Sequence, residues 1–108
     1  MIIRMWKGRT RREASDRYVE YLRETGATDI KNTAGNLGVF VGRRHHGDDA
    51  EFVVLSLWES MEAVKGFAGD DPDQARYYPD DEEFLLELTP GIDHFEVVID
   101  EEGARSHE

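Results

Sequence analysis

The sequence predicts a single α+β domain in which a four-stranded antiparallel sheet carries two main helices on one face. Three features of the 108 residues favour this fold: strand-like and helix-like segments alternate, a Gly-Asp-Asp turn at residues 47–49 joins two strand-like runs, and residues 52–67 read FVVLSLWESMEAVKGF. The last segment is an apolar strand that enters a helix directly after Trp58. Because neighbouring strand residues point to opposite faces, this strand is apolar on both faces. A chain of this length has too few helices to cover both, so we expect a second subunit.

The N-terminal part is expected to form a strand and then a helix. Residues 2–7 alternate and place Arg4 and Trp6 on the same face. Thr10 and Glu13 have the spacing of a capping box, in which both side chains accept hydrogen bonds from backbone N–H groups at a helix start. The helix itself is predicted by an apolar and aromatic stripe at Ala14, Tyr18, Tyr21 and Leu22.

The rest of the chain supplies the other elements. The helical stripe ends before Gly26, and residues 26–35 are predicted to be a loop. Ser60 is a suitable N-cap for a second helix, and Pro79 is suited to the first turn of a short one. The remaining predicted elements are a strand that alternates at Leu37, Val39 and Val41, a strand at residues 51–58, a helix at residues 61–68 and a last strand at residues 92–99.

This βαββαβ order predicts a ferredoxin-like fold, with residues 1–100 as the domain and residues 101–108 as a polar tail. The strand at residues 51–58 has two alternating apolar sets, which are Phe52, Val54 and Trp58 on one face and Val53, Leu55 and Leu57 on the other. Whichever set meets the helices, the other needs cover worth about 1.5–3 kcal/mol per large side chain. A homodimer that closes sheet against sheet would supply that cover.

Composition narrows the classes of partner. The net charge of −11 at pH 7 opposes binding to nucleic acid and to anionic membrane surfaces, so neither is an expected partner. The absence of cysteine excludes a disulfide framework and a thiolate nucleophile. The N-terminus reaches its first charge after three residues and lacks the apolar run of a signal peptide. We therefore expect a soluble cytoplasmic protein.

Nearly the whole chain resembles the antibiotic biosynthesis monooxygenase-like family of the dimeric α/β-barrel superfamily. The segments that carry the resemblance are IIRMWKG, GNLGVFVGRR, EFVVLSLWESMEAVKGFAG, ARYYPDDEEFLLE and IDHFEVV. The resemblance implies a ferredoxin-like subunit that dimerises. Activities in the family include cofactor-free oxygenation of aromatic polyketides, quinol oxidation and haem degradation, so the fold alone does not select a reaction.

The haem-degrading branch of that family is the one the resemblance disfavours. Its members use an asparagine late in the first strand, a tryptophan in the second helix and a histidine ten residues later that binds the iron. Here the first of these regions reads Arg4-Met5-Trp6-Lys7, and the other two positions are Phe67 and Tyr77. Tyrosinate can bind ferric iron, which leaves Tyr77 or Tyr78 open as a ligand. The expected cofactor is nevertheless none.

The resulting hypothesis is a cofactor-independent monooxygenase that holds a small phenol- or quinol-like molecule in a cleft between sheet and helices. Such chemistry needs a base, a donor for developing negative charge and apolar walls. His94 is the candidate base, and Arg4 or Arg76 is the candidate donor. The candidate walls are Trp6, Tyr18, Trp58, Phe67, Tyr77 and Tyr78. The alternatives are a non-catalytic protein that binds a small hydrophobic molecule, and a module whose function is the dimer itself.

Several of these residues also have a structural interpretation. Trp58 is suited to anchoring the core, Trp6 to a pocket wall or a dimer interface, and a lone strand histidine such as His94 to a structural hydrogen bond. The pair His45 and His46 beside two aspartates is typical of an exposed hairpin tip rather than of a metal site. The acidic segment at residues 70–83 is expected to be a solvated loop.

Overall fold

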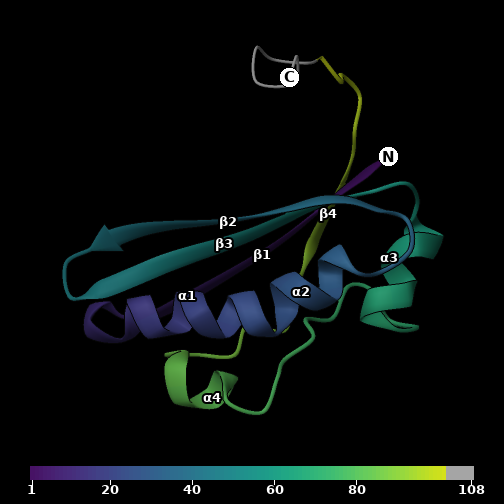
Figure 1. The fold of residues 1–108 in the computed structure, drawn as a ribbon. Coiled ribbons are helices and arrows are strands. Elements are labelled where there is room, and N and C mark those ends of the chain that lie inside the picture. The colour runs from purple at the N-terminus through teal and green to yellow at the C-terminus, as the bar shows by residue number, and fades with distance from the viewer. Residues whose placement is uncertain (102–108) are drawn as a thin grey trace.

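In the computed structural model, which describes residues 1–101, the chain forms a sheet with its helices on one side (Figure 1). The sheet is four-stranded and antiparallel with strand order β2-β3-β1-β4, which confirms the α+β, ferredoxin-like prediction. The elements are β1 (Ile2–Arg11), a 3₁₀ turn (Arg12–Ala14), α1 (Ser15–Glu24), α2 (Gly26–Lys31), β2 (Asn36–His46), β3 (Asp49–Trp58), α3 (Met61–Ala68), α4 (Asp81–Phe84) and β4 (Asp93–Glu96). None of the helices in this part of the chain has the length and apolar character needed to span a membrane.

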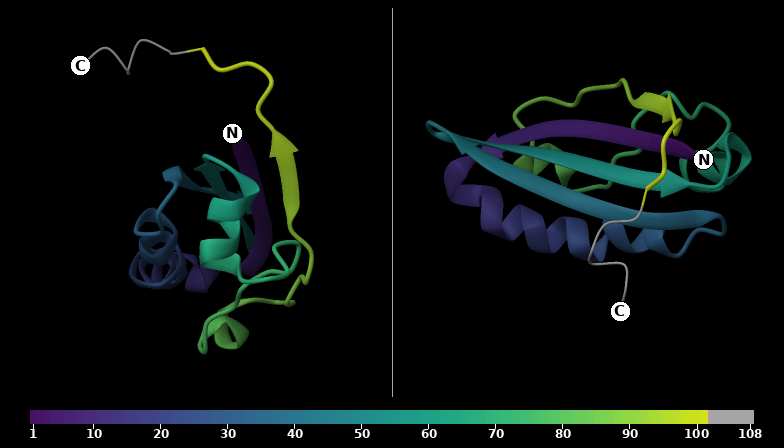
Figure 2. Two further views of the ribbon diagram at one scale, coloured as in Figure 1. Left: turned by 90° about the vertical axis from the view of Figure 1, so that its right-hand side faces the viewer. Right: turned by 90° about the horizontal axis from the view of Figure 1, so that it is seen from above.

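The two faces of the sheet have different surroundings (Figure 2). On β3 the residues Phe52, Val54 and Trp58 are buried on the helix side. Leu55 and Leu57, whose side chains alternate with these, are only half-buried. Over that second face no helix of residues 1–101 lies (Figure 2). The alternation read from the sequence is therefore confirmed, and the Trp58 set is the one that meets the helices.

The first strand is longer than predicted, and the predicted capping box at Thr10 is wrong. Thr10 belongs to β1, is fully buried, and donates its hydroxyl to the carbonyl of Arg11 at 2.9 Å. The physical reason is the long hairpin of β2 and β3, which gives β1 a partner as far as the pair Arg11 and Asp49. The helix therefore starts only at Ser15, and its predicted apolar stripe does face the core, with Tyr18 1% exposed.

A second difference is α2, which occupies part of the predicted loop at residues 26–35. The chain leaves α1 at Thr25, whose hydroxyl donates to the carbonyl of Tyr21 at 2.7 Å, and then continues as a new helical segment. Ile30 anchors this segment in the core with 3% exposure. Gly26 therefore marks a break between two helices rather than the beginning of an irregular loop.

The helix α3 forms where it was predicted, with the Ser60 hydroxyl accepting a hydrogen bond from the backbone N–H of Ala63 at 3.2 Å. The last strand is shorter than the predicted residues 92–99. It ends at Glu96, because its partner β1 begins at Ile2, opposite that residue. Val98 and Ile99 lie beyond the sheet and are 81% and 75% exposed. Of the predicted tail at residues 101–108, all but Glu101 lies outside the described residues.

The segment between α3 and β4 runs back along the helix side of the sheet (Figure 1). Backbone hydrogen bonds fix its two arms to each other and to β1. The Ala75 N–H donates to Pro90 at 2.8 Å, and the Leu86 N–H donates to Arg9 at 2.9 Å. The short helix predicted after Pro79 does form, but it ends at Phe84 and leaves Leu88 41% exposed. This segment forms one wall of the site described next.

Candidate functional site

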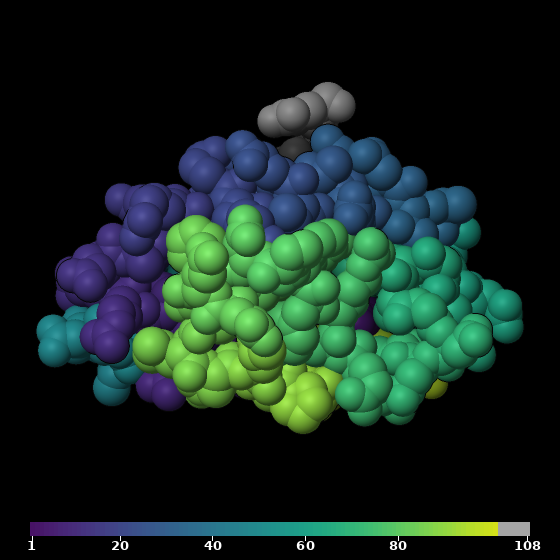
Figure 3. Space-filling model, turned by 90° about the horizontal axis from the view of Figure 1, so that it is seen from below, coloured from purple at the N-terminus to yellow at the C-terminus, as the bar shows by residue number. Residues whose placement is uncertain are grey.

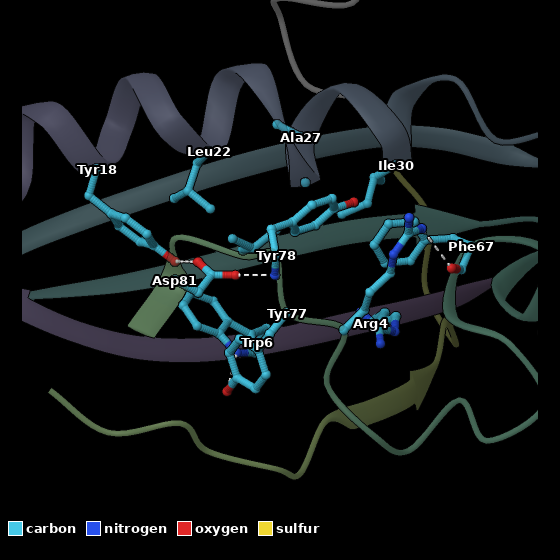
Figure 4. Close-up of a pocket in the computed structure, with 13 residues that line it drawn as sticks. Arg4, Trp6, Tyr18, Leu22, Ala27, Ile30, Phe67, Tyr77, Tyr78 and Asp81 are labelled. Carbon is cyan, nitrogen blue, oxygen red and sulfur yellow. Dashed lines mark hydrogen bonds between the residues drawn. The ribbon is translucent and has the colours of Figure 1, made fainter. Parts of the chain in front are cut away.

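A cavity of about 50 Å³ lies between the sheet, α1 and α2, and the segment that joins α3 to α4. In the space-filling view, the green segment between α3 and β4 lies over the centre of the helix side, beside the blue α1 and α2, and a purple part of the N-terminal region is visible through a narrow opening beside it (Figure 3). The close-up shows side chains from both layers converging there (Figure 4). The lining residues are Arg4, Trp6, Tyr18, Leu22, Gly26, Ala27, Ile30, Val54, Phe67, Arg76, Tyr77, Tyr78 and Asp81.

Most of the residues selected from the sequence meet at this cavity. Those that line it are Arg4, Trp6, Tyr18, Phe67, Arg76, Tyr77 and Tyr78. Trp58 does not line it. Its ring is completely buried, and its indole N–H donates to the hydroxyl of Ser56 at 2.8 Å. Trp58 is therefore a core residue whose one polar atom has a partner within the same strand.

His94 is also not among the residues that line the cavity. It lies on β4 opposite Arg4, and its Nδ1 is 3.2 Å from a carboxylate oxygen of Asp73. Its Nε2 is buried and has no hydrogen-bond partner among the described residues. Burial lowers the pKa of His94, and the positive charge of Arg4 lowers it further. His94 therefore lies beside Arg4 of the cavity wall, and burial and Arg4 favour its neutral form although Asp73 opposes this.

Trp6 lies flat along its own strand inside the cavity. Its indole N–H donates to the hydroxyl of Tyr77 at 3.2 Å, and that hydroxyl donates to the carbonyl of Thr89. A side chain at Gly8 would overlap with the Trp6 ring. The missing side chain of Gly8 thus allows the indole to recline, a requirement that the sequence pattern did not reveal.

Asp81 is the residue that sequence reasoning missed. It was included in a solvated acidic segment, yet it is 4% exposed and lines the cavity. One carboxylate oxygen accepts from the Tyr18 hydroxyl at 2.9 Å and the other from the backbone N–H of Tyr78 at 2.6 Å (Figure 4). Burial raises the pKa of Asp81, although both hydrogen bonds oppose that rise. Burial also raises the pKa of Tyr18, and the negative charge of Asp81 adds to this effect.

The other end of the cavity is cationic. Arg4 is 4% exposed, and its guanidinium lies 5.4 Å from the centre of the Phe67 ring. One of its terminal nitrogens donates to the carbonyl of Gln74 at 3.3 Å, whereas its buried Nε has no partner among residues 1–101. Burial lowers the pKa of Arg4 to about 10, so the guanidinium remains charged at neutral pH.

Arg76 forms the more exposed part of this cationic end. Its guanidinium lies 4.9 Å from the centre of the Phe67 ring and 5.1 Å from the centre of the Tyr78 ring. It also lies 3.6 Å from a carboxylate oxygen of Asp29, which accepts the Tyr78 hydroxyl at 2.6 Å. Arg76, Asp29 and Tyr78 therefore form a linked group that closes the cavity between α2 and the segment after α3.

The residues of this cavity do not fit a haem. Pockets for drug-sized ligands already occupy roughly 300 Å³ or more, well above the volume found here. The two tyrosines left open as iron ligands donate their hydroxyls to the Thr89 carbonyl and to Asp29. Burial raises the pKa of both phenols, which opposes the tyrosinate form that would bind iron. The hydroxyls of both tyrosines are thus already used in hydrogen bonds within the protein.

Comparisons with known proteins agree with this architecture. Residues 1–75 match the antibiotic biosynthesis monooxygenase family. A candidate antibiotic biosynthesis monooxygenase from Bacillus cereus is 22% identical, with a TM-score of 0.63, and the match covers 94% of this chain and 97% of that one. The haem-degrader MhuD from Mycobacterium tuberculosis, solved with two haems in its active site, is 22% identical, with a TM-score of 0.59 over 94% of this chain and 100% of its own. No curated protein sequence matches the chain. Because the family match extends over more than half of the 108 residues, the chain belongs to the antibiotic biosynthesis monooxygenase family.

Proposed function

We propose that the protein is a cofactor-independent monooxygenase that oxidises a small phenol- or quinol-like molecule in this cavity. The observation that carries the proposal is the placement of a buried carboxylate, Asp81, and a buried guanidinium, Arg4, within aromatic walls. A base and a cationic donor in a site with little water are what a phenol needs in order to react as its anion. The monooxygenase-like fold of the family agrees with this chemistry.

The reaction balances without an external reductant. Transfer of the phenolic proton to Asp81 gives a phenolate, whose ring carbon donates electrons to dioxygen and forms a C–O bond. The peroxide takes up a proton, and loss of the ring hydrogen as a proton then breaks the O–O bond. One phenol and one dioxygen give one quinone and one water, and every electron that reduces dioxygen comes from the phenol. Guanidinium groups at the cavity stabilise the negative charge that passes from the phenolate to the peroxide.

Asp81 takes the role that the sequence suggested for His94, because Asp81 lines the cavity and His94 does not. A base works best when its pKa approaches the working pH. Burial moves the pKa of Asp81 upward, in the direction that strengthens it as a base. The Tyr18 hydroxyl holds one carboxylate oxygen in place at 2.9 Å. Tyr18 is thus a positioning residue for the proton acceptor.

The cavity must widen to admit an aromatic ring. Its volume of about 50 Å³ is small beside the roughly 300 Å³ of a typical ligand pocket. Arg76 is the most exposed of its charged walls and rests on the Tyr78 ring. Movement of Arg76 and Tyr78 away from Asp29 would open the cavity without disturbing the buried core. A ring that enters would then replace Tyr78 as the partner of the Arg76 guanidinium.

Oxygen uptake with a panel of phenols, quinols and fused-ring phenols tests the proposal. The protein should consume dioxygen after treatment with a chelator, with one quinone formed for each dioxygen used. Asp81→Asn should lower the rate about 100-fold or more, as expected for loss of a general base. Asp80→Asn is the matched control, because its side chain is exposed one position away and should leave the rate unchanged. An equal effect of both changes, or no uptake with any member of the panel, would count against an oxygenase.

The alternative function is a non-catalytic protein that binds a small hydrophobic molecule in the same cavity. Every hydroxyl of the tyrosine walls already has a partner, which suits a site selected for shape rather than for reaction. The two functions differ in one measurement. A ligand that binds to the cavity, as shown by its loss in Trp6→Ala, but never causes oxygen uptake would support the binding protein.

A homodimer completes the proposal. The open face of the sheet presents an apolar group, which consists of Ile3, Met5, Val53, Leu55, Leu57 and Phe95. Phe95 is 50% exposed although it lies in the pairing register opposite Ile3. A second copy related by a twofold axis would bring the same apolar group against itself, which is the self-complementary contact that such symmetry requires. Each large side chain covered would contribute about 1.5–3 kcal/mol.

A further inference from the structure

We propose that the ligand of this cavity is a small aromatic hydroxy acid, held with its carboxylate at Arg4 and its hydroxyl at Asp81. The inference deepens the proposed function, since it names the class of molecule that enters the same cavity. It rests on three properties of the cavity: an incompletely satisfied buried cation, a buried carboxylate with remaining acceptor capacity, and aromatic walls. Figure 4 shows Arg4 and Asp81 apart from each other within the cavity.

Arg4 is the strongest of these observations. A buried guanidinium is normally paired with an acid, because removing an isolated charge from water is strongly unfavourable. Arg4 is 4% exposed, and no carboxylate of residues 1–101 forms an ion pair with it. It has a carbonyl, Gln74, and the face of Phe67 as partners, while its Nε has none in this part of the chain. An anion is the missing partner that fits this cation.

The nearby acids are already engaged. Asp73 is the acid that most raises the pKa of Arg4, yet its side chain is 76% exposed and contacts His94 at 3.2 Å. Asp29 serves Arg76 and the Tyr78 hydroxyl. Neither acid forms an ion pair with Arg4. Arg forms bidentate hydrogen bonds with carboxylates, so a carboxylate is the anion that suits Arg4 best.

The opposite end of the cavity requires a donor rather than a second anion. Asp81 accepts one hydrogen bond on each carboxylate oxygen, from Tyr18 and from the backbone of Tyr78. An ionised carboxylate has about four acceptor sites, so each oxygen retains capacity for another donor. A ligand with negative charge at this end would be repelled, whereas a hydroxyl would be bound. The cavity is therefore suited to a molecule that is an anion at one end and a proton donor at the other.

Because the chain has a net negative charge, a preference for an acid over its neutral ester would indicate a local cationic site. At −11, the protein as a whole repels acids, so an acid that binds better than its neutral ester reports a local cation and not general attraction. The rings of Trp6 and Phe67 supply the flat apolar walls that an aromatic ligand would contact. Arg76 then remains as the second guanidinium, available for charge that develops when oxygen adds.

The test measures binding without reaction, by calorimetry in the absence of oxygen. The probes are 4-hydroxybenzoate, its methyl ester, benzoate and phenol. We expect 4-hydroxybenzoate to bind at least about 10-fold more tightly than the ester, which lacks the charge, and than benzoate, which lacks the hydroxyl. A difference of 10-fold corresponds to about 1.4 kcal/mol. Equal affinity for the acid and the ester would overturn the proposal.

Two variants test which residue binds the carboxylate of the ligand and which binds its hydroxyl. Arg4→Gln should remove the preference for the acid over the ester, and Asp81→Asn should weaken the preference for 4-hydroxybenzoate over benzoate. Lys7→Gln is the matched control, because Lys7 lies on the same strand but is exposed on the opposite face. It should leave both preferences unchanged. If Arg4→Gln does not fold, the probe series on the unmodified protein still decides the question.

The outcome for this inference is separable from that for the oxygenase. Binding of 4-hydroxybenzoate with the expected preferences, followed by no oxygen uptake with any substrate, would reject the oxygenase and retain the acid site. Oxygen uptake with neutral phenols, together with no preference for acids, would retain the oxygenase and reject the acid site. Thermal unfolding gives an independent measure, because a ligand that binds only the folded state stabilises it. The acid should therefore stabilise the unmodified protein but not Arg4→Gln.

Discussion

The two faces of the sheet depart from the usual distribution, in which charged side chains are exposed and apolar side chains are buried. The face covered by helices buries a guanidinium, that of Arg4, whereas the open face exposes apolar side chains such as Phe95. Burying a charge without a partner is unfavourable, and so is leaving an apolar surface in water. Each face thus points to a molecule outside the single chain, a ligand on one side and a second subunit on the other.

Buried polar residues on the covered face also differ among themselves. Ser56 accepts from the indole of Trp58, and Thr10 donates to a carbonyl of its own strand. These polar atoms are satisfied within the fold and need no ligand. Arg4 keeps an unpaired nitrogen among the described residues and lines the cavity. His94 also has a buried nitrogen without a partner among these residues, but it does not line the cavity. Incomplete pairing therefore identifies the site only together with a place in the cavity wall.

The largest effect is expected from breaking the open face. Leu55→Lys places a charge at the centre of the apolar group, between Met5 and Phe40 in the strand register. If the homodimer forms through this face, the two copies together lose roughly 3–6 kcal/mol of association free energy. Sedimentation equilibrium should then show a monomer for the variant and a dimer for the unmodified protein.

A control distinguishes this effect from a general change in solubility. Leu88→Lys alters a leucine that is 41% exposed, on the segment between α4 and β4 and off the sheet. It should remain a dimer. A dimer that survives Leu55→Lys would show that another surface joins the subunits, and a monomeric unmodified protein would leave the open face without its expected cover.

The two tryptophans on the covered face test the difference between a core residue and a residue that lines the cavity. Trp58→Ala should lower the free energy of unfolding by about 3–5 kcal/mol, because it removes a fully buried ring from the core. Trp6→Ala should lower it less, because Trp6 is half-buried and lines the cavity. Urea unfolding measures both. Equal losses would mean that Trp6 is also a core residue, and the cavity wall would then need another definition.

Much of the fold follows from local pattern. Alternation on β3 correctly separates Trp58 from Leu55, and Ser60 correctly starts α3. Errors occur where a distant partner decides the outcome. Thr10 lies in a strand because the hairpin reaches Ala50, its pairing partner. The last strand ends at Glu96 because β1 begins opposite it at Ile2. Beyond that pair, Val97 keeps one backbone hydrogen bond to Met1. Such partners lie far away in sequence and are invisible to a reading of neighbouring residues.

The site was predictable in its aromatic residues and its two arginines but not in its acid, Asp81. Periodicity identifies Trp6, on the strand face of Arg4, and Tyr18, on the apolar stripe of the helix. The sequence pattern does not distinguish Asp80 from Asp81, however. Only the turn after Pro79 directs the Asp81 side chain toward Tyr18. His94 was selected for its chemistry, yet the strand places it opposite Arg4 and against Asp73. Side-chain direction in the turn after Pro79 decided the first case, and the register of β4 against β1 decided the second.

Gly8 tests how closely the cavity depends on the position of Trp6. Gly8→Ala would overlap with the reclining indole and also approach Leu85, so the ring must rise into the cavity. We expect about 1–3 kcal/mol of lost stability from this overpacking, together with loss of ligand binding. Gly91→Ala is the control, since a side chain there meets no atom within 4 Å. Ligand binding that survives Gly8→Ala would show that the indole does not define the width of the cavity.

The smallest effect concerns His94 and separates a structural role from a catalytic one. Its pKa in the folded state is lowered from the ordinary value of 6.5, first by burial and then by Arg4, although Asp73 and Asp93 oppose this. The unfolded chain therefore binds the proton more tightly than the folded chain. The contribution of a neutral His94 to stability is present above about pH 6.5 and is lost as the pH falls through the lowered pKa.

Unfolding in urea between about pH 8 and pH 5 measures this contribution. Stability should fall more steeply with decreasing pH in the unmodified protein than in His94→Gln, whereas His46→Gln, at an exposed position on β2, should follow the unmodified protein. Oxygen uptake by His94→Gln should persist at neutral pH, because the proton acceptor that we propose is Asp81. If uptake is lost while the pH dependence of stability is unchanged, His94 is catalytic after all, and the cavity must extend through the wall formed by Arg4 to reach it.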